Sequence, residues 1–325
     1  MPATVTGLRY PCTRVLLPRT RLAYVHLKNL LTDAKRDRGA RVSGYVAIWL
    51  PEEFLVLYLQ RGELVNASLH DGQAFQPIAI GAAIEKVPME PEYGEICFHE
   101  TDDEQLACMY ASQMRAADPW PAELRPSEPS SLFPYLMAST FDGMVEIAHD
   151  GAVNYLLFKN GVVENTYLAG MQGGSIVERV SRLFDEKRRV LHMTVRRWPM
   201  PEPIPIQAPT GLVQAYRDLA TSLVLRLVAD GRENAPSLAE QARVRLLVAH
   251  PALEGISFSG RVPRAVVADA AALTSGTAAL INELLWDGTE AGAEGPAALL
   301  RDLMHERRHL FQSAGLYEQI HWNLT

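Results

Sequence analysis

The chain has 325 residues, 48% of them hydrophobic and 21% charged, with a net charge of −7 at pH 7. The length favours roughly two or three domains of an ordinary globular protein, and the negative charge argues against nucleic-acid binding, which needs clustered basic residues facing phosphates. Its three cysteines show no CxxC spacing and no signal-peptide core is present, so we expect a cytoplasmic protein without disulfides.

The first part of the chain predicts a small α+β unit. Leu22, Val25 and Leu30 recur at helical spacing, whereas the β-rich runs that follow are separated by turn residues such as Pro51 and Gly62. In chain order we expect a helix over residues 22–34, strands over 45–50, 54–59 and 63–69, a helix over 75–87 and a strand over 95–99.

A proline-rich segment over residues 118–130 ends this unit, because proline fixes φ and removes an amide donor. The same order of elements then returns. Ser175 and Glu178 have the spacing of a capping box, and Asp150–Gly151 is typical of a tight hairpin turn. We expect a helix over 130–138, strands over 144–148, 152–158 and 162–167, a helix that begins at Ser175 and a strand over 189–197.

This return is a duplication. Residues 44–69 and 143–168 align without a gap at an offset of 99, and their apolar positions coincide through most of the window. Both matched turn glycines lie where a turn favours positive φ. The alignment matches Gly44 with Gly143, Ile48 with Ile147, Gly62 with Gly161 and Asn66 with Asn165. A local basic cluster near the end of the second copy indicates a charged, solvated strand edge. It consists of Lys187, Arg188, Arg189, Arg196 and Arg197.

A second proline-rich segment, residues 199–209, favours an extended spacer, and the rest of the chain is helical in pattern. Thr210 can cap a helix that Gly231 ends. The apolar stretch 265–285 contains Asp269 and Glu283, so it predicts buried helices and no membrane span. We expect helices over 211–230, 237–249, 263–273, 277–286 and 296–312, and a partly packed loop over 250–260.

The predicted fold class is α+β: two tandem repeats of helix, three-stranded antiparallel meander, helix and strand, followed by an all-α C-terminal domain. The first module spans residues 1–117, the linker 118–130, the second module 131–198, the second linker 199–209 and the helical domain 210–325.

The repeated pattern resembles the PATAN-like domain, the PatA N-terminal type of bacterial signalling proteins. The matching residues are Ser43-Gly44-Tyr45-Val46, Leu57 to Arg61, Gly62 to Ala67 and Ile78 to Val87. The tandem resemblance runs over residues 20–198. It covers residues 20–115 well, and residues 128–198 are a more divergent copy with Thr166 in place of Ala67. The resemblance implies a non-catalytic adaptor or regulatory module that works through protein contacts.

The sharpest chemical motif is His305-Glu306-Arg307-Arg308-His309. On a helix, HExxH places two imidazoles on one face to hold zinc, with Glu306 as general base. His321 is the remaining candidate for a third ligand. Two arginines between the glutamate and the second histidine are not typical of zinc proteases, so the motif is interpreted as the polar face of a surface helix.

A glycine-rich segment before a predicted helix, Gly173-Gly174-Ser175, could present amides to an anion, as helix N-termini do. It matches no phosphate-binding motif, and a flexible loop with an N-cap is the alternative. Cys97 and His99 share one strand face by alternation, which is typical of core positions.

The sequence therefore predicts a bacterial-type, non-enzymatic signalling adaptor or scaffold that acts through protein–protein contacts and needs no cofactor. Its protein partner is unknown, and a homodimer is one expected arrangement. The first alternative is a zinc-dependent hydrolase that uses His305, Glu306 and His309. The second alternative is a sensor of a small anionic ligand or nucleotide at Gly173–Ser175.

Overall fold

A computed structural model describes residues 7–36, 42–88, 92–170, 174–184, 193–258, 267–286 and 295–323. The chain divides into two compact units, Met1–Ile204 and Pro205–Thr325. The boundary between them lies inside the second proline-rich segment. Both copies of the repeat belong to the first unit, and the second unit is helical.

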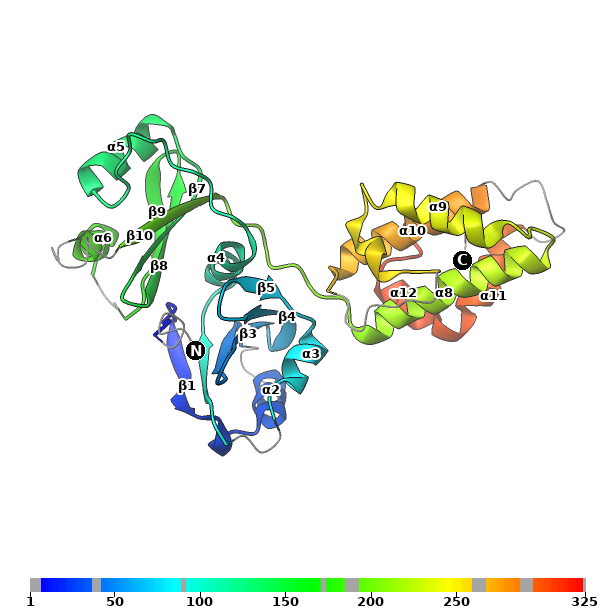
Figure 1. Cartoon of the computed structure of the whole chain (residues 1–325), viewed down its shortest axis with the longest axis horizontal. Helices are drawn as coiled ribbons and strands as arrows, with labels where there is room; N and C mark the ends of the chain where they lie inside the picture. The colour runs from blue at the N-terminus through cyan, green and yellow to red at the C-terminus, as the bar shows by residue number, and fades with distance from the viewer. Residues whose placement is uncertain are drawn as a thin grey trace. The chain divides into compact units, whose positions relative to one another are not determined.

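The first unit has two antiparallel sheets, one of six strands in the order β1-β6-β2-β3-β4-β5 and one of four in the order β10-β7-β8-β9 (Figure 1). Its elements are β1 (Arg14–Arg21), η1 (Leu22–Tyr24), α2 (Leu27–Arg36), β2 (Gly44–Trp49), β3 (Phe54–Gln60), β4 (Glu63–His70), β5 (Phe75–Pro77), α3 (Ile80–Glu85), β6 (Glu95–Glu100), α4 (Asp103–Met114), α5 (Pro129–Ala138), β7 (Gly143–His149), β8 (Ala152–Lys159), β9 (Val162–Tyr167), α6 (Ile176–Phe184) and β10 (Thr194–Pro199).

Both sheets are covered on two faces. Helices α2 and α3 pack on one face of the six-stranded sheet, and α5 and α6 pack on one face of the four-stranded sheet. Helix α4 lies between the remaining faces, where Leu106 and Met109 join a core that includes Tyr58 of the first module and Tyr155 of the second (Figure 1). The two modules therefore share one hydrophobic core.

The two modules repeat the same strand pairing residue by residue. Each has a register shift in the hairpin of its second and third meander strands, β3–β4 and β8–β9, directly after Tyr58 and directly after Leu157. The matched asparagines behave alike, because Asn66 Oδ1 and Asn165 Oδ1 each accept from the amide of the next residue at 2.8 Å. A slip of one residue would exchange the sheet faces, so identical register confirms the duplication. Equivalent pairs include Gly44↔Leu59 with Gly143↔Phe158, and Gly44↔Glu100 with Gly143↔Pro199.

The matched turn glycines also confirm the prediction made for them. Gly62 has φ +78° and Gly161 has φ +76°. In each module the turn rests on the end of the preceding helix: a Cβ on Gly62 would lie 2.7 Å from the carbonyl oxygen of Ala34, and one on Gly161 would lie 2.6 Å from that of Leu136. A side chain would strain the backbone at both sites and collide with the helix.

Several predicted elements of the first module need correction. The helix expected over 22–34 begins at Leu27, and residues 22–24 form a short 3-10 helix instead. The helix expected over 75–87 is β5 followed by α3, because Phe75 pairs with His70 on β4. Strand β1 and helix α4 were not predicted. Strand β1 combines Pro18 with several arginines, so it lacks an alternating pattern.

The second module follows its prediction closely. The capping box is formed, with the Glu178 amide donating to Ser175 Oγ at 3.3 Å and the Ser175 amide donating to Glu178 Oε2 at 2.8 Å. The segment over 118–130, expected to be a spacer, is hydrogen-bonded to β10. The Asp118 amide donates to the carbonyl of Arg197, and Trp120 Nε1 donates to the carbonyl of Val195. Residues 189–192 of the predicted last strand lie outside the described residues.

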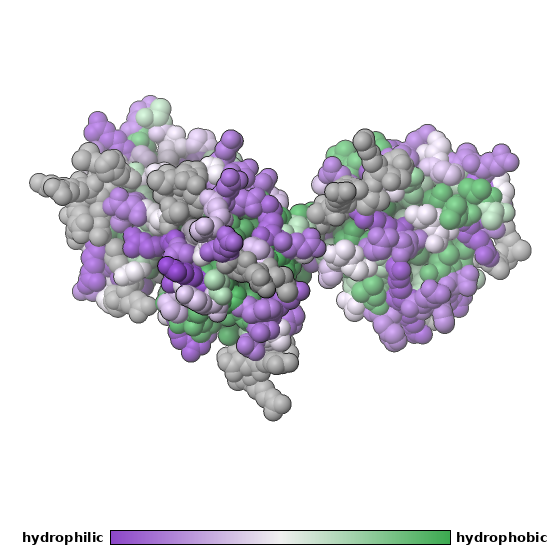
Figure 2. All heavy atoms as spheres, turned by 60° about the horizontal axis from the view of Figure 1, so that its bottom comes forward, coloured by the Kyte–Doolittle hydropathy of each residue, from purple (hydrophilic) through white to green (hydrophobic). Residues whose placement is uncertain are grey.

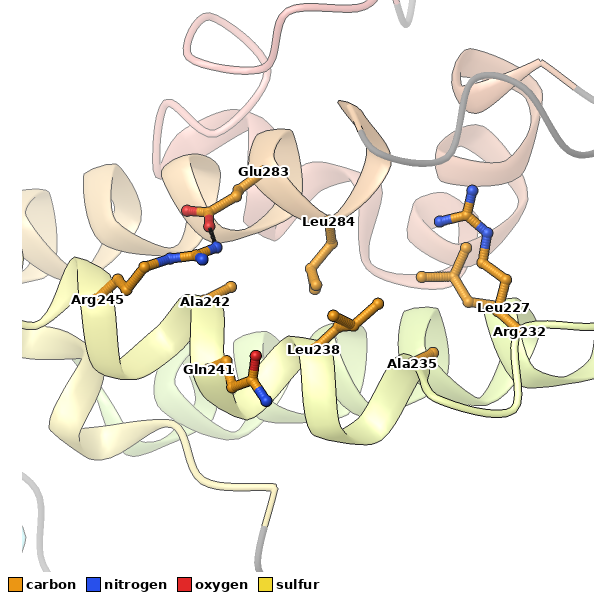
Figure 3. A pocket seen from close by; sticks show the side chains of 9 residues that line it. All are labelled: Leu227, Arg232, Ala235, Leu238, Gln241, Ala242, Arg245, Glu283 and Leu284. Carbon is orange, nitrogen blue, oxygen red and sulfur yellow. Dashed lines mark hydrogen bonds and ion pairs between the residues drawn. The ribbon is translucent and has the colours of Figure 1, made fainter.

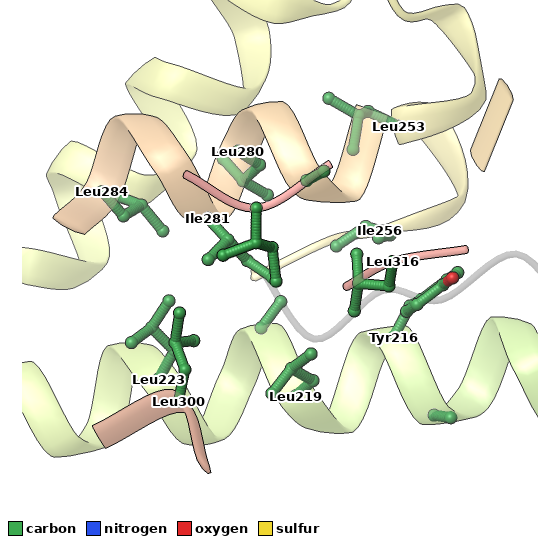
Figure 4. Close-up of a cluster of buried hydrophobic side chains, with 14 of the residues drawn as sticks. Tyr216, Leu219, Leu223, Leu253, Ile256, Leu280, Ile281, Leu284, Leu300 and Leu316 are labelled. Carbon is green, nitrogen blue, oxygen red and sulfur yellow. The ribbon is translucent and has the colours of Figure 1, made fainter. Parts of the chain in front are cut away.

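The second unit packs its helices around one apolar core (Figure 4). Tyr216 and Phe311 stack with ring centroids 5.7 Å apart, and the Tyr216 hydroxyl lies 2.8 Å from Thr274 Oγ1. Its elements are α8 (Thr210–Ala229), α9 (Ala235–Leu246), η2 (Pro251–Gly255), α10 (Ala270–Trp286), α11 (Pro296–Met304), η3 (His305–Arg307) and α12 (Arg308–Ser313).

Some predictions for this unit change. Thr210 is the first helical residue, so it does not cap α8, and Pro209 takes the cap position. The helices expected over 263–273 and 277–286 are one helix from Ala270, and residues 263–266 lie outside the described part. Of the loop expected over 250–260, the described residues 250–258 are packed, with Leu253 and Ile256 buried. Within the described residues, the structure contains no helix long and apolar enough to span a membrane.

Candidate functional site

The HExxH motif does not lie on a regular helix. Helix α11 ends at Met304, residues 305–307 form a 3-10 turn, and α12 begins at Arg308. The side chains of His305, Glu306 and His309 are all exposed. Across the described ranges, no three His, Cys, Asp or Glu side chains come together as a metal site would require. His321 is also exposed, and its amide donates to Asn282 Oδ1 at 3.1 Å.

The glycine-rich segment offers little to an anion. Gly173 lies outside the described residues, and Gly174 has φ +91°. The amide of Ser175 already donates to the carboxylate of Glu178, so a negative charge occupies the place an anion would take. Hydrogen bonds from Ser175 lower the pKa of Glu178, which keeps that carboxylate ionised.

The basic cluster is engaged in the fold. Arg196 Nη2 lies 2.5 Å from Glu146 Oε1 on the neighbouring strand. Arg197 lies over the Trp120 ring at 4.8 Å and donates to the carbonyl of Pro119 at 2.7 Å. Strand β10 is an edge of its sheet and Arg196 is exposed there, as expected, and both arginines also hold β10 to its neighbours. Lys187, Arg188 and Arg189 lie outside the described residues.

The clearest difference between the two modules is at their matched turns. In the first module, Lys35 beside Gly62 forms an ion pair with Glu63 at 2.5 Å. In the second module the equivalent places, beside Gly161, hold Met137 and Val162. These two apolar side chains are 60% and 62% exposed. The same backbone thus carries a solvated ion pair in one copy and an exposed apolar pair in the other.

Strand β9, which begins at Val162, is an edge of the four-stranded sheet. Edge strands offer unpaired amides and carbonyls, and proteins usually protect them with proline, lysine or a covering segment. Among the edge strands that the structure describes, β9 is the one without proline, since β1, β5 and β10 contain Pro18, Pro77 and Pro199. The outer end of β9, at Val162–Glu164, is thus an edge segment without proline, where Glu164 pairs with Lys159 of β8.

Other exposed apolar side chains lie elsewhere on the described surface, among them Val177 of α6 at 77% and Val248 at 92%. In the face drawn in Figure 2, hydrophobic residues form small areas among hydrophilic ones. The second unit has a hollow between α9 and α10 of only about 30 Å³, lined by Leu238 and Leu284 and bordered by the ion pair of Arg245 with Glu283 (Figure 3). This hollow has room for about one water molecule.

The sequence pattern missed Met137 and Val162. A signal was present, because aligning the turns would have shown Glu63 replaced by valine. The helix that carries Met137 aligns with the first helix at an offset of 102, whereas the strands align at 99. Met137 is therefore recognised as the equivalent of Lys35 only in the structure, where each lies beside its turn glycine.

The architecture defines an α+β protein with an internal duplication and a helical second unit. No protein-family model, no curated protein and no solved structure matches this chain.

Proposed function

We propose that this chain is a non-enzymatic signalling adaptor that binds a protein partner through the turn and edge of its second module. The observation that carries the proposal is the replacement of the Lys35–Glu63 ion pair by exposed Met137 and Val162. Two exposed apolar side chains do not stabilise a solvated turn, whereas aromatic residues and methionine are enriched at protein interfaces. The resemblance to PATAN-like domains points to the same class of function.

The partner proposed is an extended segment of another protein. Such a segment would hydrogen-bond to the outer edge of β9 and place an apolar side chain against Met137 and Val162. The backbone bonds would supply affinity, and the apolar pair would supply specificity. This is addition of a strand to an open sheet edge.

The first module supplies its own test of this proposal. The double substitution Met137→Lys with Val162→Glu transfers the ion pair of the first turn to the second. Because the first module folds with this pair, the variant should keep the wild-type stability within about 1 kcal/mol, as surface ion pairs contribute little. Affinity purification from native cells should recover a partner with the wild type and about tenfold less of it with the variant.

The matched control is Lys35→Met with Glu63→Val, which makes the first turn apolar and leaves the second intact. It should recover the partner at the wild-type level. Amide hydrogen exchange should also slow at Val162–Glu164 in the purified complex. Equal recovery of the same partners by the wild type and by Met137→Lys with Val162→Glu would contradict the proposal.

A further inference from the structure

The first module contains a cavity of about 300 Å³ on the side of its sheet that faces the second module. Strands β2 and β6 form its floor, where Tyr45 pairs with His99 and Ala47 with Cys97. The segment around Arg9 and the Ala169–Gly170 turn of the second module form its walls. Arg9 is exposed at the rim, so the space is a pocket open to solvent, and its volume is that of a small ligand site.

The duplication explains why the cavity exists in one module. Ala47 and Cys97 are a small cross-strand pair, and their equivalents 99 residues later are Glu146 and Arg196. In the second module these two long side chains meet across the strands as an ion pair and fill the corresponding space. The first module has small residues at both places, so its cavity is a local feature of the side chains and not of the fold.

The walls are cationic and aromatic. The guanidinium of Arg19 lies 4.1 Å from the centre of the Trp49 ring, and its Nε donates to Glu95 at 2.7 Å while its Nη2 pairs with the same carboxylate, so Glu95 already balances the charge of Arg19. Arg9 is exposed at the rim, and no acidic side chain is among the described residues that line the space. Guanidinium groups bind carboxylates and phosphates with paired hydrogen bonds, so the cavity favours an anion.

The remaining polar groups are suited to binding and not to reaction. Tyr45 donates to the carbonyls of Tyr10 and Pro11, at 3.2 and 3.1 Å, and its oxygen lies 2.7 Å from His99 Nδ1. Burial lowers the pKa of His99, so the imidazole is neutral at pH 7. Burial also raises the pKa of the Cys97 thiol to about 12, so it is not an activated nucleophile.

We propose that this cavity binds a small planar carboxylate, an aromatic ring that carries one carboxylate group. The carboxylate is held by Arg9 at the rim, and the ring lies among Tyr45, Trp49 and His99. The volume lies at the lower end of the range of about 300–1,000 Å³ for ligand pockets, which suits a single ring system and not a dinucleotide. The inference is independent of the contact surface at Met137 and Val162.

Binding here would link the two modules. The Arg9 amide donates to the carbonyl of Gly151, and the Val153 amide donates to that of Arg9, so this wall is attached to the second module. The floor belongs to the first module. A ligand between them adds contacts to both, and a ligand that binds the native state raises its apparent stability.

The test uses the full-length chain with indole-3-carboxylate and benzoate as probes, and with indole-3-carboxamide, inorganic phosphate and AMP for comparison. The carboxylates should raise the melting temperature, bind in calorimetric titration and slow the alkylation of half-buried Cys12, which lines the same space. The neutral amide, phosphate and AMP should do none of these. Tighter binding of phosphate or AMP than of either carboxylate would overturn the assignment, as would no carboxylate binding up to about 10 mM.

Two substitutions locate the site. Arg9→Gln removes an exposed charge, so the variant should fold normally and its Kd for indole-3-carboxylate should rise about tenfold or more. Ala47→Leu places a larger side chain in the cavity and should abolish binding. The matched control is Arg14→Gln on β1, since Arg14 pairs with Glu100 and does not line the space. Equal loss of binding in Arg14→Gln, or unchanged binding in both Arg9→Gln and Ala47→Leu, would overturn the proposal.

Discussion

Glu146 is buried in the second module, with only 2% of its side chain exposed, and it pairs with Arg196, which is 48% exposed. Burial raises the pKa of Glu146, and the charge and hydrogen bonds of Arg196, with a hydrogen bond from Ser112 on α4, only partly oppose that rise. Tyr10 from the N-terminal segment also faces this carboxylate. Burial therefore disfavours the ionised form of Glu146, and the contact with Arg196 only partly offsets this cost.

This cost predicts a pH dependence of stability. The folded state binds the Glu146 proton more tightly than the unfolded chain, so the group's contribution to stability is fully present below the unfolded pKa, about 4.5, and is lost as pH rises through the folded value. In urea denaturation between pH 4.5 and 7, the wild type should therefore gain stability relative to Glu146→Gln as the pH falls. Parallel plots of stability against pH for the two proteins would contradict this prediction, because they would mean that folding does not raise the pKa of Glu146.

At the scale of an element, each module places a turn of two left-handed residues against the end of a helix. Arg61 has φ +50° and Gly62 φ +78°, and the second module repeats this with Asn160 and Gly161. The helix end lies closer to the glycine than any Cβ would allow. The turn therefore fixes how α2 lies on the sheet.

Gly62→Ala should destabilise the first unit by about 1–3 kcal/mol, because it adds backbone strain and a collision with the carbonyl of Ala34. The control is Gly81→Ala in α3, where an added Cβ meets nothing within 4 Å and φ is not positive. That change should leave stability unchanged or raise it by up to about 1 kcal/mol, since alanine favours helix over glycine. Chemical denaturation of both variants decides the point, and equal stabilities would refute the packing argument.

The three-stranded meander of each module was predictable because β-rich runs, turn glycines and an internal copy all indicated the same register. Helix α4 was not predicted because it is buried between two sheets, so it has no clear polar face for periodicity to detect. A capping signal was present: Asp102 accepts from the Gln105 amide at 2.7 Å, and acidic residues fill the first turn. The cavity could not be predicted from the sequence, because Ala47 and Cys97 are typical of ordinary core positions. Their significance appears only when they are compared with their long, charged equivalents in the second module, Glu146 and Arg196.

At the scale of the whole molecule, the shared core makes the two modules depend on each other. Tyr155, Leu157 and Trp198 of the second module are buried with Leu106 and Met109 of α4. Polar contacts reinforce this packing: Ser112 Oγ lies 3.0 Å from the Tyr155 hydroxyl, Trp198 Nε1 donates to the carbonyl of Arg115 at 2.9 Å, and the Tyr167 hydroxyl donates to Glu104 at 2.6 Å. The folding unit is therefore the pair of modules and not either repeat alone.

Fragments of the chain test this dependence. Residues 1–204 and residues 205–325 should each fold alone, because each holds its own core, and each should melt cooperatively by circular dichroism. A fragment of residues 1–117 keeps every strand of the first sheet but exposes the face of α4 that the second module covers. Burial of each large apolar side chain stabilises the fold by roughly 1.5–3 kcal/mol. Exposing several of them would therefore cost more than the free energy of unfolding of a small domain. That fragment should therefore lack a cooperative melt, whereas a sharp transition near that of residues 1–204 would mean that the repeats fold as separate domains.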